Sequence, residues 1–320
     1  MVVIIKEVTL KDAAAMILEA DNIGILIHQF PDGDAIGSGY ALQKGLTSLG
    51  KKARVICDHI IPEKYIDIIG VTDEKSFEPE VFISVDLATK DLLGENLAEL
   101  ADNVLINIDH HYSNTHFAEY NFVDSSAAAA AEIAYELLLL MKVPVSKEIA
   151  NCIYIGISTD TGCFRYSNVT PKTHKIAAQM IEYGANFFLI NKEMFDTKSK
   201  ARIEMERLAL TQMEYYFNDK CALMLISLDM IAKTKAKEED LEGLTPIPRQ
   251  IKGVLAGITL REKQDGTYKI SIRSDPRIDA RAVCSRLNGG GHKCAAGCTV
   301  NGPLENAKKA ITDALSNYIL

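Results

Sequence analysis

Four apolar runs of strand length constrain the fold of this chain more than any other feature. They are continuous rather than alternating, and each ends in a polar or acidic residue: NIGILIH (22–28), ARVICD (53–58), VFISVD (81–86) and VLINID (104–109). Continuous apolarity is typical of strands that are covered on both faces, and helix-like segments lie between and after these runs. The pattern therefore predicts an α/β fold with a parallel sheet.

The length and the later pattern predict a second domain. A chain of 320 residues is long enough for two domains. We expect an N-terminal parallel-sheet catalytic domain over 1–187, a charged helical connector over 188–218, and a smaller α+β substrate-binding domain over 219–320. In the last segment, runs such as CALMLISL and TYKISIRS predict strands that are separated by turn signals.

Composition excludes several classes of protein. The net charge of −8 opposes binding of long nucleic acid, which needs a basic face, but a short or mononucleotide substrate is compatible with it. The chain has no signal-peptide pattern and no uninterrupted membrane-length apolar segment, so we expect a cytoplasmic protein without membrane contact. Its seven cysteines form no CxxC pair, and HKCAAGC (292–298) has too few ligands for a structural zinc, so we expect packing cysteines.

At the ends of three of the four runs stand residues that can bind a metal or a substrate, namely His28, Asp86 and Asp109. Ligands of open α/β sheets bind outside the carboxyl ends of the strands, so these side chains should converge on one edge. PDGD after the first run is also good turn chemistry, but several carboxylates on one rim would repel one another without a cation. The residues expected to converge are His28, Asp32, Asp34, Asp86, Asp109, His110 and His111.

The mixture of carboxylates and imidazoles indicates the kind of metal. It suits Mn²⁺ or a similar ion, with Mg²⁺ or Co²⁺ as substitutes, rather than the all-oxygen shell of Ca²⁺ or the thiolate shell of structural zinc. Two such ions can activate a water for attack on phosphorus and stabilise the charge that develops. The sequence therefore predicts a metal-dependent phosphoesterase.

Taken together, these motifs resemble a known family. His28-x-x-x-Asp32-x-Asp34, the VD of Asp86, the Asp109-His110-His111 triplet and GISTDTGCFRYSNVT around Asp160 are similar to the four motifs of the DHH phosphoesterase superfamily. ISIRS followed by GGGHKCAAG resembles the associated C-terminal domain of that superfamily, so the likeness spans nearly the whole chain. Within the superfamily, the chain most resembles the group of bifunctional oligoribonucleases and pAp phosphatases.

The resemblance implies a role for each of these residues. One Mn²⁺ would be held by His28, Asp32 and Asp86, and a second by Asp34, Asp86, His110 and Asp160. Asp109 would orient His110, while His111 and Arg165 would act on the substrate. The part of the substrate that does not react would be bound by Arg273, Ser274, Gly289, Gly290, Gly291 and His292.

The family also implies a substrate class. We expect short RNA oligonucleotides to be hydrolysed to nucleoside monophosphates, with pAp as a further substrate. The alternative is a phosphodiesterase for cyclic dinucleotides such as c-di-AMP, or for linear products such as pApA. A nucleotide sensor without activity would have lost ligands, and none is missing here. The oligomeric state stays open, with a homodimer as one option.

Overall fold

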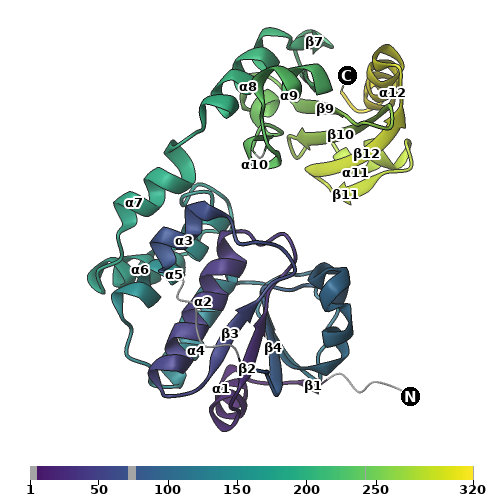
Figure 1. The fold of residues 1–320 in the computed structure, drawn as a ribbon. Helices are drawn as coiled ribbons and strands as arrows, with labels where there is room; N and C mark the ends of the chain where they lie inside the picture. Colours follow the sequence, from purple (N-terminus) through teal and green to yellow (C-terminus); the bar gives the residue numbers. More distant parts are fainter. Residues whose placement is uncertain (1–5, 71–76, 242, 320) are drawn as a thin grey trace. The chain divides into compact units, whose positions relative to one another are not determined.

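The protein has two compact units, Met1–Thr197 and Lys198–Leu320, and each contains its own sheet (Figure 1). The computed structural model describes residues 6–70, 77–241 and 243–319. None of the helices within these ranges is both long and apolar enough to cross a membrane.

The first unit is built on a six-stranded sheet of order β1-β6-β5-β4-β2-β3, in which every pairing is parallel. Its strands are β1 (Lys6–Glu7), β2 (Ile23–Leu26), β3 (Ala53–Ile56), β4 (Val81–Val85), β5 (Val104–Asp109) and β6 (Tyr120–Val123). The four predicted strands and their parallel arrangement are confirmed. The sequence pattern did not predict β1 and β6, which are short and extend the sheet beyond β5.

Both faces of this sheet are covered, which explains the continuous apolar runs. Alternate residues of a strand face opposite sides. Ile25 therefore lies in a core with α1, α2, α4 and α5, whereas Leu26 packs with Ala101 on the other face, where η1 and η2 lie. The helices are α1 (Leu10–Glu19), α2 (Gly33–Ser48), α3 (Glu63–Ile69), α4 (Ala130–Leu140), α5 (Lys147–Asp160), α6 (Pro171–Glu182), α7 (Phe187–Asn191), 3₁₀ segments η1 (Lys90–Leu93) and η2 (Glu95–Asn103), and the π-helical η3 (Lys192–Asp196).

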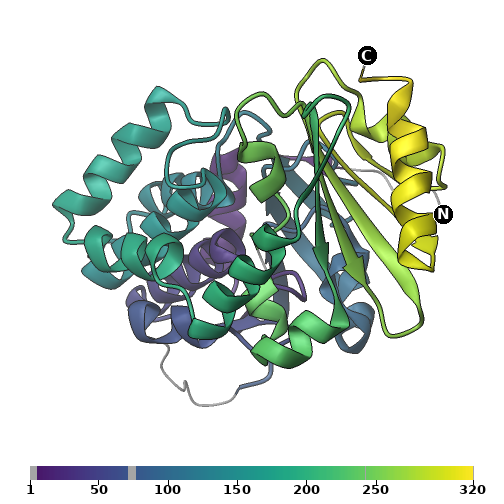
Figure 2. The ribbon, with the colours of Figure 1, turned by 90° about the horizontal axis from the view of Figure 1, so that it is seen from above.

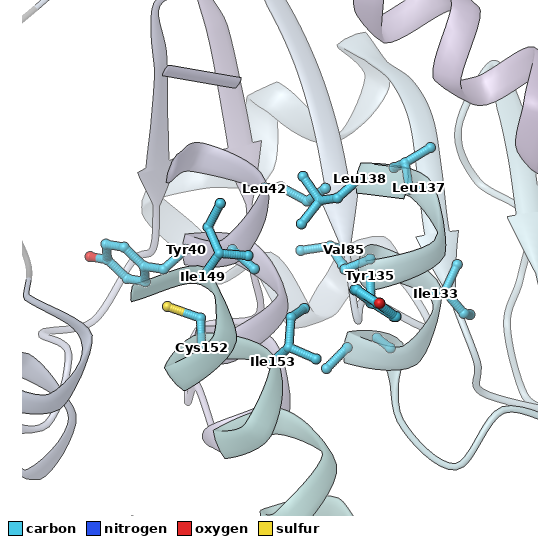
Figure 3. Close-up of a cluster of buried hydrophobic side chains, with 14 of the residues drawn as sticks. Tyr40, Leu42, Val85, Ile133, Tyr135, Leu137, Leu138, Ile149, Cys152 and Ile153 are labelled. Atoms are coloured by element: carbon cyan, nitrogen blue, oxygen red, sulfur yellow. The ribbon is translucent and has the colours of Figure 1, made fainter. Parts of the chain in front are cut away.

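Three helices meet over the sheet in one buried cluster. Figure 3 shows Leu42 of α2, Leu138 of α4 and Ile153 of α5 gathered around Val85 of β4, and all four side chains are fully buried. Because Asp86 directly follows Val85, this packing fixes the end of β4 from which Asp86 projects. The core therefore positions the edge of the sheet that carries the candidate ligands.

The second unit has a mixed sheet of order β11-β12-β10-β9-β8-β7, in which only β8 and β9 pair in parallel. Its strands are β7 (Glu214–Tyr216), β8 (Cys221–Ile226), β9 (Ala256–Glu262), β10 (Thr267–Ser274), β11 (Gly290–His292) and β12 (Ala295–Asn301). Its helices are α8 (Lys200–Thr211), α9 (Leu228–Thr234), α10 (Glu238–Leu241), η4 (Ile247–Gln250), α11 (Ala280–Ser285) and α12 (Leu304–Ser316). The predicted α/β fold class with a smaller α+β part is confirmed.

Helices cover both faces of the second sheet. Leu223 of β8 packs with Ile311 of α12, which lies along one face in Figure 2, and Met224 packs with Met205 of α8 on the other face. The segment 188–218, expected to be a helical connector, is helical up to Asp196 and again from Lys200 to Thr211, and it then forms the edge strand β7. Three residues that pair with β8 are too short a segment to show strand periodicity.

Candidate metal centre and active site

The carboxyl ends of β2, β4 and β5 bring the predicted ligands together. His28 Nε2 lies 3.8 Å from Asp32 Oδ1 and 3.9 Å from Asp86 Oδ2. On the other side, His110 Nε2 lies 3.6 Å from Asp34 Oδ2, 3.4 Å from Asp86 Oδ1 and 3.8 Å from Asp160 Oδ2. Two groups of potential metal ligands, His28/Asp32/Asp86 and Asp34/His110/Asp160, therefore lie side by side.

Asp86 occupies the centre of this arrangement. Asp86 is only 3% exposed, and its Oδ1 accepts no well-formed hydrogen bond from the described residues, although Nε2 of His110 lies 3.4 Å from it. Its backbone adopts a left-handed conformation (φ 56°), which costs a non-glycine residue about 1–2 kcal/mol. A buried carboxylate oxygen without a well-formed hydrogen bond, on a strained backbone and among other carboxylates, is costly by itself, whereas a bound cation would satisfy it.

Buried amides hold the chain that follows Asp86. Ser84 Oγ donates to Asn107 Oδ1 (2.9 Å), and Asn107 Nδ2 donates to the carbonyl oxygen of Leu87 (3.1 Å). Asn114 Nδ2 approaches the same oxygen at 3.3 Å. Ser84 and Asn107 are fully buried on the neighbouring strands β4 and β5. These bonds maintain the left-handed turn that aims Asp86 into the site.

Asp34 is fixed by the first turn of α4. Its carboxylate accepts hydrogen bonds from the backbone N–H groups of Ala130 (2.5 Å) and Ala131 (2.9 Å). The N-terminus of a helix carries a partial positive charge and free N–H groups, so it stabilises a buried carboxylate. Ala130 and Ala131 belong to the alanine run 127–131, whose side chains give no sequence signal for a helix start that binds a carboxylate.

Close packing of α2 against α5 brings Asp34 near Asp160. A Cβ on Gly37 of α2 would lie 2.4 Å from the carbonyl oxygen of Cys152 in α5. A Cβ on Gly156 of α5 would lie 2.8 Å from Oδ1 of Asp34 in α2 and 2.5 Å from the Cβ of Ala131 in α4. Glycine is therefore required at both positions for the observed helix separation. The two helices carry Asp34 in the first turn of α2 and Asp160 at the last residue of α5.

Asp32 combines the two properties that its sequence context suggested. Its Oδ1 accepts hydrogen bonds from the backbone N–H groups of Asp34 (3.0 Å) and Ala35 (3.1 Å), so it is the N-cap of α2. The carboxylate also faces His28 at 3.8 Å. The turn interpretation and the ligand interpretation of PDGD are thus compatible.

The prediction that Asp109 orients His110 was wrong. Asp109 does not orient His110: its Oδ1 lies 2.8 Å from Nδ1 of His111, and its Oδ2 accepts a hydrogen bond from Asn114 Nδ2 (2.5 Å). The ring nitrogen Nδ1 of His110 instead faces the carbonyl oxygen of Ala127 at 3.2 Å, which leaves its Nε2 toward the carboxylates. Consecutive residues at a strand end point in different directions, so adjacency in sequence did not identify the partner.

The clustered charges shift the pKa of several site residues in the metal-free protein. Burial lowers the pKa of His110, but Asp86, Asp34 and Asp160 outweigh it and raise the pKa to about 10. Burial, reinforced by the neighbouring carboxylates, raises the pKa of Asp160 to about 6 and raises that of Asp34. At neutral pH the metal-free site therefore holds a proton on His110, which a divalent cation would displace.

His111 and Asp109 form an acid–base pair beside the ligand groups. The hydrogen bond to Asp109 raises the pKa of His111, even though burial opposes the shift. Burial would raise the pKa of Asp109, but the bonds from His111 and Asn114 lower it overall. Asp109 is fully buried and His111 is half-buried. The pair therefore favours the protonated form of His111 and holds its Nδ1, so Nε2 is the ring nitrogen that can face a ligand.

The loop after α5 contains one residue that the sequence analysis missed. Asn168 Nδ2 donates to the carbonyl oxygens of Ala128 (2.9 Å) and Asp160 (3.2 Å), so it joins the end of α5 to the start of α4. It stands in the same FRYSN motif as Arg165, which was the only available signal. Arg165 is exposed, and its Nε donates to the carbonyl oxygen of Gly162 in its own loop.

In the second unit, strand pairing aligns two of the predicted substrate-binding residues. Arg273 of β10 and His292 of β11 both pair with Ala295 of β12, on its two sides. Directly paired residues of antiparallel strands point to the same face, so Arg273 and His292 share one face of the sheet. Both side chains are at least partly exposed.

Ser274 does not belong to that row, which corrects the sequence expectation. It alternates with Arg273 along β10 and therefore faces the opposite side of the sheet. Its hydroxyl is buried and donates to the carbonyl oxygen of Ile278 (2.8 Å), so it supports the following loop.

The three consecutive glycines of this region differ in their surroundings. A Cβ on Gly289 would lie 2.3 Å from the carbonyl oxygen of Gly297, and one on Gly291 would lie 2.6 Å from that of Ala295. A Cβ on Gly290 would meet nothing within 4 Å. Gly289 and Gly291 thus permit strand packing, and Gly290 leaves bare backbone open to a ligand.

Known proteins share both units. Residues 22–157 match the N-terminal domain of the DHH family, and residues 222–319 match the DHHA1 domain. The bifunctional oligoribonuclease and PAP phosphatase NrnA of Thermus thermophilus is 31% identical over 301 residues, covering 92% of this chain and 89% of that protein. The chain belongs to the DHH family. The predicted family is therefore confirmed.

Further relatives extend the likeness of this DHH protein over nearly its whole length. The bifunctional oligoribonuclease and PAP phosphatase NrnA of Bacillus subtilis is 26% identical, covering 88% of this chain and 90% of that protein. An exopolyphosphatase-related protein from Bacteroides fragilis is similar in structure, with a TM-score of 0.86, 28% identity, and coverage of 97% of this chain and 96% of that one. Exonuclease RecJ, solved with manganese bound, shares the fold at a TM-score of 0.53 and 16% identity, covering 97% and 94%.

Proposed function

We propose that this DHH protein is a divalent-metal-dependent phosphoesterase that hydrolyses very short oligoribonucleotides to nucleoside monophosphates and removes the 3′-phosphate of pAp. The proposal is carried by the position of Asp86, whose buried carboxylate belongs to the His28/Asp32/Asp86 group and also lies 3.4 Å from His110 of the second group. The substrate class is supported by relatives of this chain that are named bifunctional oligoribonuclease and PAP phosphatase.

The donor set fits Mn²⁺, with Mg²⁺ or Co²⁺ as substitutes, because it mixes imidazole with carboxylate. Two bound ions would activate water and stabilise the charge that develops on the phosphate. We assign one position to His28, Asp32 and Asp86, and the second to Asp34, Asp86, His110 and Asp160.

Two further residues of the first unit, His111 and Arg165, would act on the substrate directly. Nε2 of His111 would donate a proton to the leaving oxygen or a hydrogen bond to the scissile phosphate, because Asp109 holds its Nδ1 and favours the protonated ring. Asn114 keeps Asp109 in that orientation. Arg165 is exposed, and its side chain would have to give up the hydrogen bond to the carbonyl oxygen of Gly162 in order to bind the phosphate.

The second unit would bind the part of the substrate that does not react. Arg273 would form a charge-assisted bond with a phosphate, and His292 on the same sheet face would donate to or stack on the substrate. The open backbone of Gly290 would allow a phosphate to approach closely. Arg273→Ala and His292→Ala should therefore weaken the binding of short RNA and pAp and leave the hydrolysis of bis-p-nitrophenyl phosphate unchanged.

A product time course with Mn²⁺ tests this proposal. The panel contains pAp, RNA dimers to pentamers, a long single strand, pyrophosphate, c-di-AMP and pApA. We expect the short RNAs and pAp to have the highest kcat/KM, with monophosphates as products. A preference for c-di-AMP or pApA would instead make the chain a cyclic-dinucleotide phosphodiesterase, and equal kcat/KM on short and long RNA would indicate a general exonuclease. The cytoplasmic location of the protein and its assembly as a homodimer stay predictions, which this assay does not test.

A further inference from the structure

Two exposed rings are stacked on each other near the candidate metal centre. Phe30 lies in the loop between β2 and α2, and its ring centroid is 4.6 Å from that of His59, with an interplanar angle of 29°. Phe30 is 69% exposed and His59 is also exposed. Neither ring belongs to an apolar core cluster of the described residues, so the pair is not part of a core.

The pair lies at the sheet edge that carries the ligands. Phe30 stands between His28 and Asp32 in the sequence, and His59 follows β3, the neighbour of β2 in the sheet (Figure 1). Strands of a parallel sheet end at the same edge, so the loops that carry the two rings flank the metal ligands.

Both loops are held in place. Cys57 Sγ contacts the carbonyl oxygen of His28 at 3.4 Å, and the backbone N–H of Gln29 donates to the carbonyl oxygen of Leu92 at 2.8 Å. Asn96 Nδ2 donates to Asp58 Oδ1 at 2.6 Å. The loops that carry the two rings are therefore held by neighbouring segments, and a ligand that stacks on the rings would not have to order the loops first.

We propose that the Phe30–His59 pair is a stacking face for the second nucleobase of an oligonucleotide whose scissile phosphate lies at the metal centre. The proposal rests on the proposed function and specifies where the base next to the cleaved bond is bound. Aromatic rings bind the faces of all four bases, so such a contact favours RNA without selecting a sequence. Because pAp has a single base, it would not use this face.

Substitution of Phe30 tests the proposal. Loss of one base–aromatic stack corresponds to a decrease of about 5- to 150-fold in binding. Phe30→Ala and Phe30→Leu should therefore raise the KM for RNA dimers by about fivefold or more, whereas Phe30→Tyr should retain the wild-type value. Activity on pAp and on bis-p-nitrophenyl phosphate should be unchanged. Phe188→Ala is the matched control, because Phe188 of α7 is 70% exposed and should affect no substrate.

A binding measurement separates this inference from the proposed function. A dinucleotide with a non-hydrolysable linkage and 2-aminopurine as the second base should lose fluorescence on binding to the wild type, and lose less on binding to Phe30→Ala. Equal quenching by the two proteins would overturn the stacking face, whether or not the wild type cleaves RNA. Equal losses on RNA dimers, pAp and the small ester would also overturn it, because Phe30 would then support His28 and Asp32. A change of oligomeric state in Phe30→Ala would show an interface between copies of the chain instead.

Discussion

Replacement of Gly37 by alanine should damage the metal centre without touching a ligand. Gly37 lies one turn after Asp34 in α2, and its Cβ would lie 2.4 Å from the carbonyl oxygen of Cys152 and 2.8 Å from the backbone nitrogen of Gly156. Both are backbone atoms of α5, which cannot rotate away as a side chain can. To lengthen the 2.4 Å contact to about 3.4 Å, α2 and α5 must separate by about 1 Å.

The effect on the site should exceed the effect on stability. Overpacking costs about 1–3 kcal/mol, and alanine regains about 1 kcal/mol of helix propensity, so the free energy of unfolding should decrease by roughly 0–2 kcal/mol. However, α2 carries Asp34 and α5 carries Asp160, which lie 3.6 and 3.8 Å from Nε2 of His110. Displacement of one ligand by about 1 Å should reduce metal affinity and kcat roughly 10- to 100-fold.

Gly39→Ala provides the control in the same helix. Its Cβ would lie 3.1 Å from Cγ2 of Ile27 and 3.5 Å from Cγ2 of Val55, which are side-chain atoms that can shift by a few tenths of an ångström. Both variants gain the same helix propensity, so they differ mainly in what the new methyl group meets. Metal affinity would be measured by calorimetry, kcat on the best substrate, and stability by urea unfolding. Equal metal affinity in the two variants would refute the argument.

Four further outcomes are expected. Asp86→Ala removes the central ligand and should lower kcat by at least about 100-fold; near-normal kcat in this variant would exclude the two-metal arrangement. Chelation of the metal should abolish activity, and Mn²⁺ should restore it better than Mg²⁺. Asp109→Asn replaces a charge-assisted bond to His111 by a neutral one at a cost of about 1–2 kcal/mol, so kcat should fall roughly 5- to 30-fold with unchanged metal affinity; loss of metal in this variant would contradict the pairing. The pKa of His110 is raised to about 10 without metal, so its proton must leave when a cation binds, and metal affinity should rise by about tenfold per pH unit between neutral pH and that pKa. Calorimetry in buffers of different ionisation enthalpy measures this release, and binding heats that do not depend on the buffer would contradict it.

Local pattern was sufficient to predict the scaffold and the ligand edge. The four runs could be predicted as strands because strands covered on both faces are mainly apolar, with Ser84 and Asn107 as buried polar exceptions. In a parallel sheet the residues that follow such strands, such as His28 and Asp86, meet at one edge. The short strands β6 and β7 were not predicted, because three or four residues are too few to establish a periodicity.

Only the tertiary structure decided how the candidate site is supported. Asp109 pairs with His111 and not with His110, because the direction of each side chain at a strand end depends on the turn and on the groups packed around it. Arg273 and His292 share a face while Ser274 does not, because strand register and the two-residue alternation determine which side chains face each other. Likewise, α4 holds Asp34 by backbone N–H groups that are 96 and 97 residues away in the chain. Sequence spacing determines which side chains reach the edge of the sheet, whereas contacts between distant segments depend on packing of the whole unit, which no local pattern encodes.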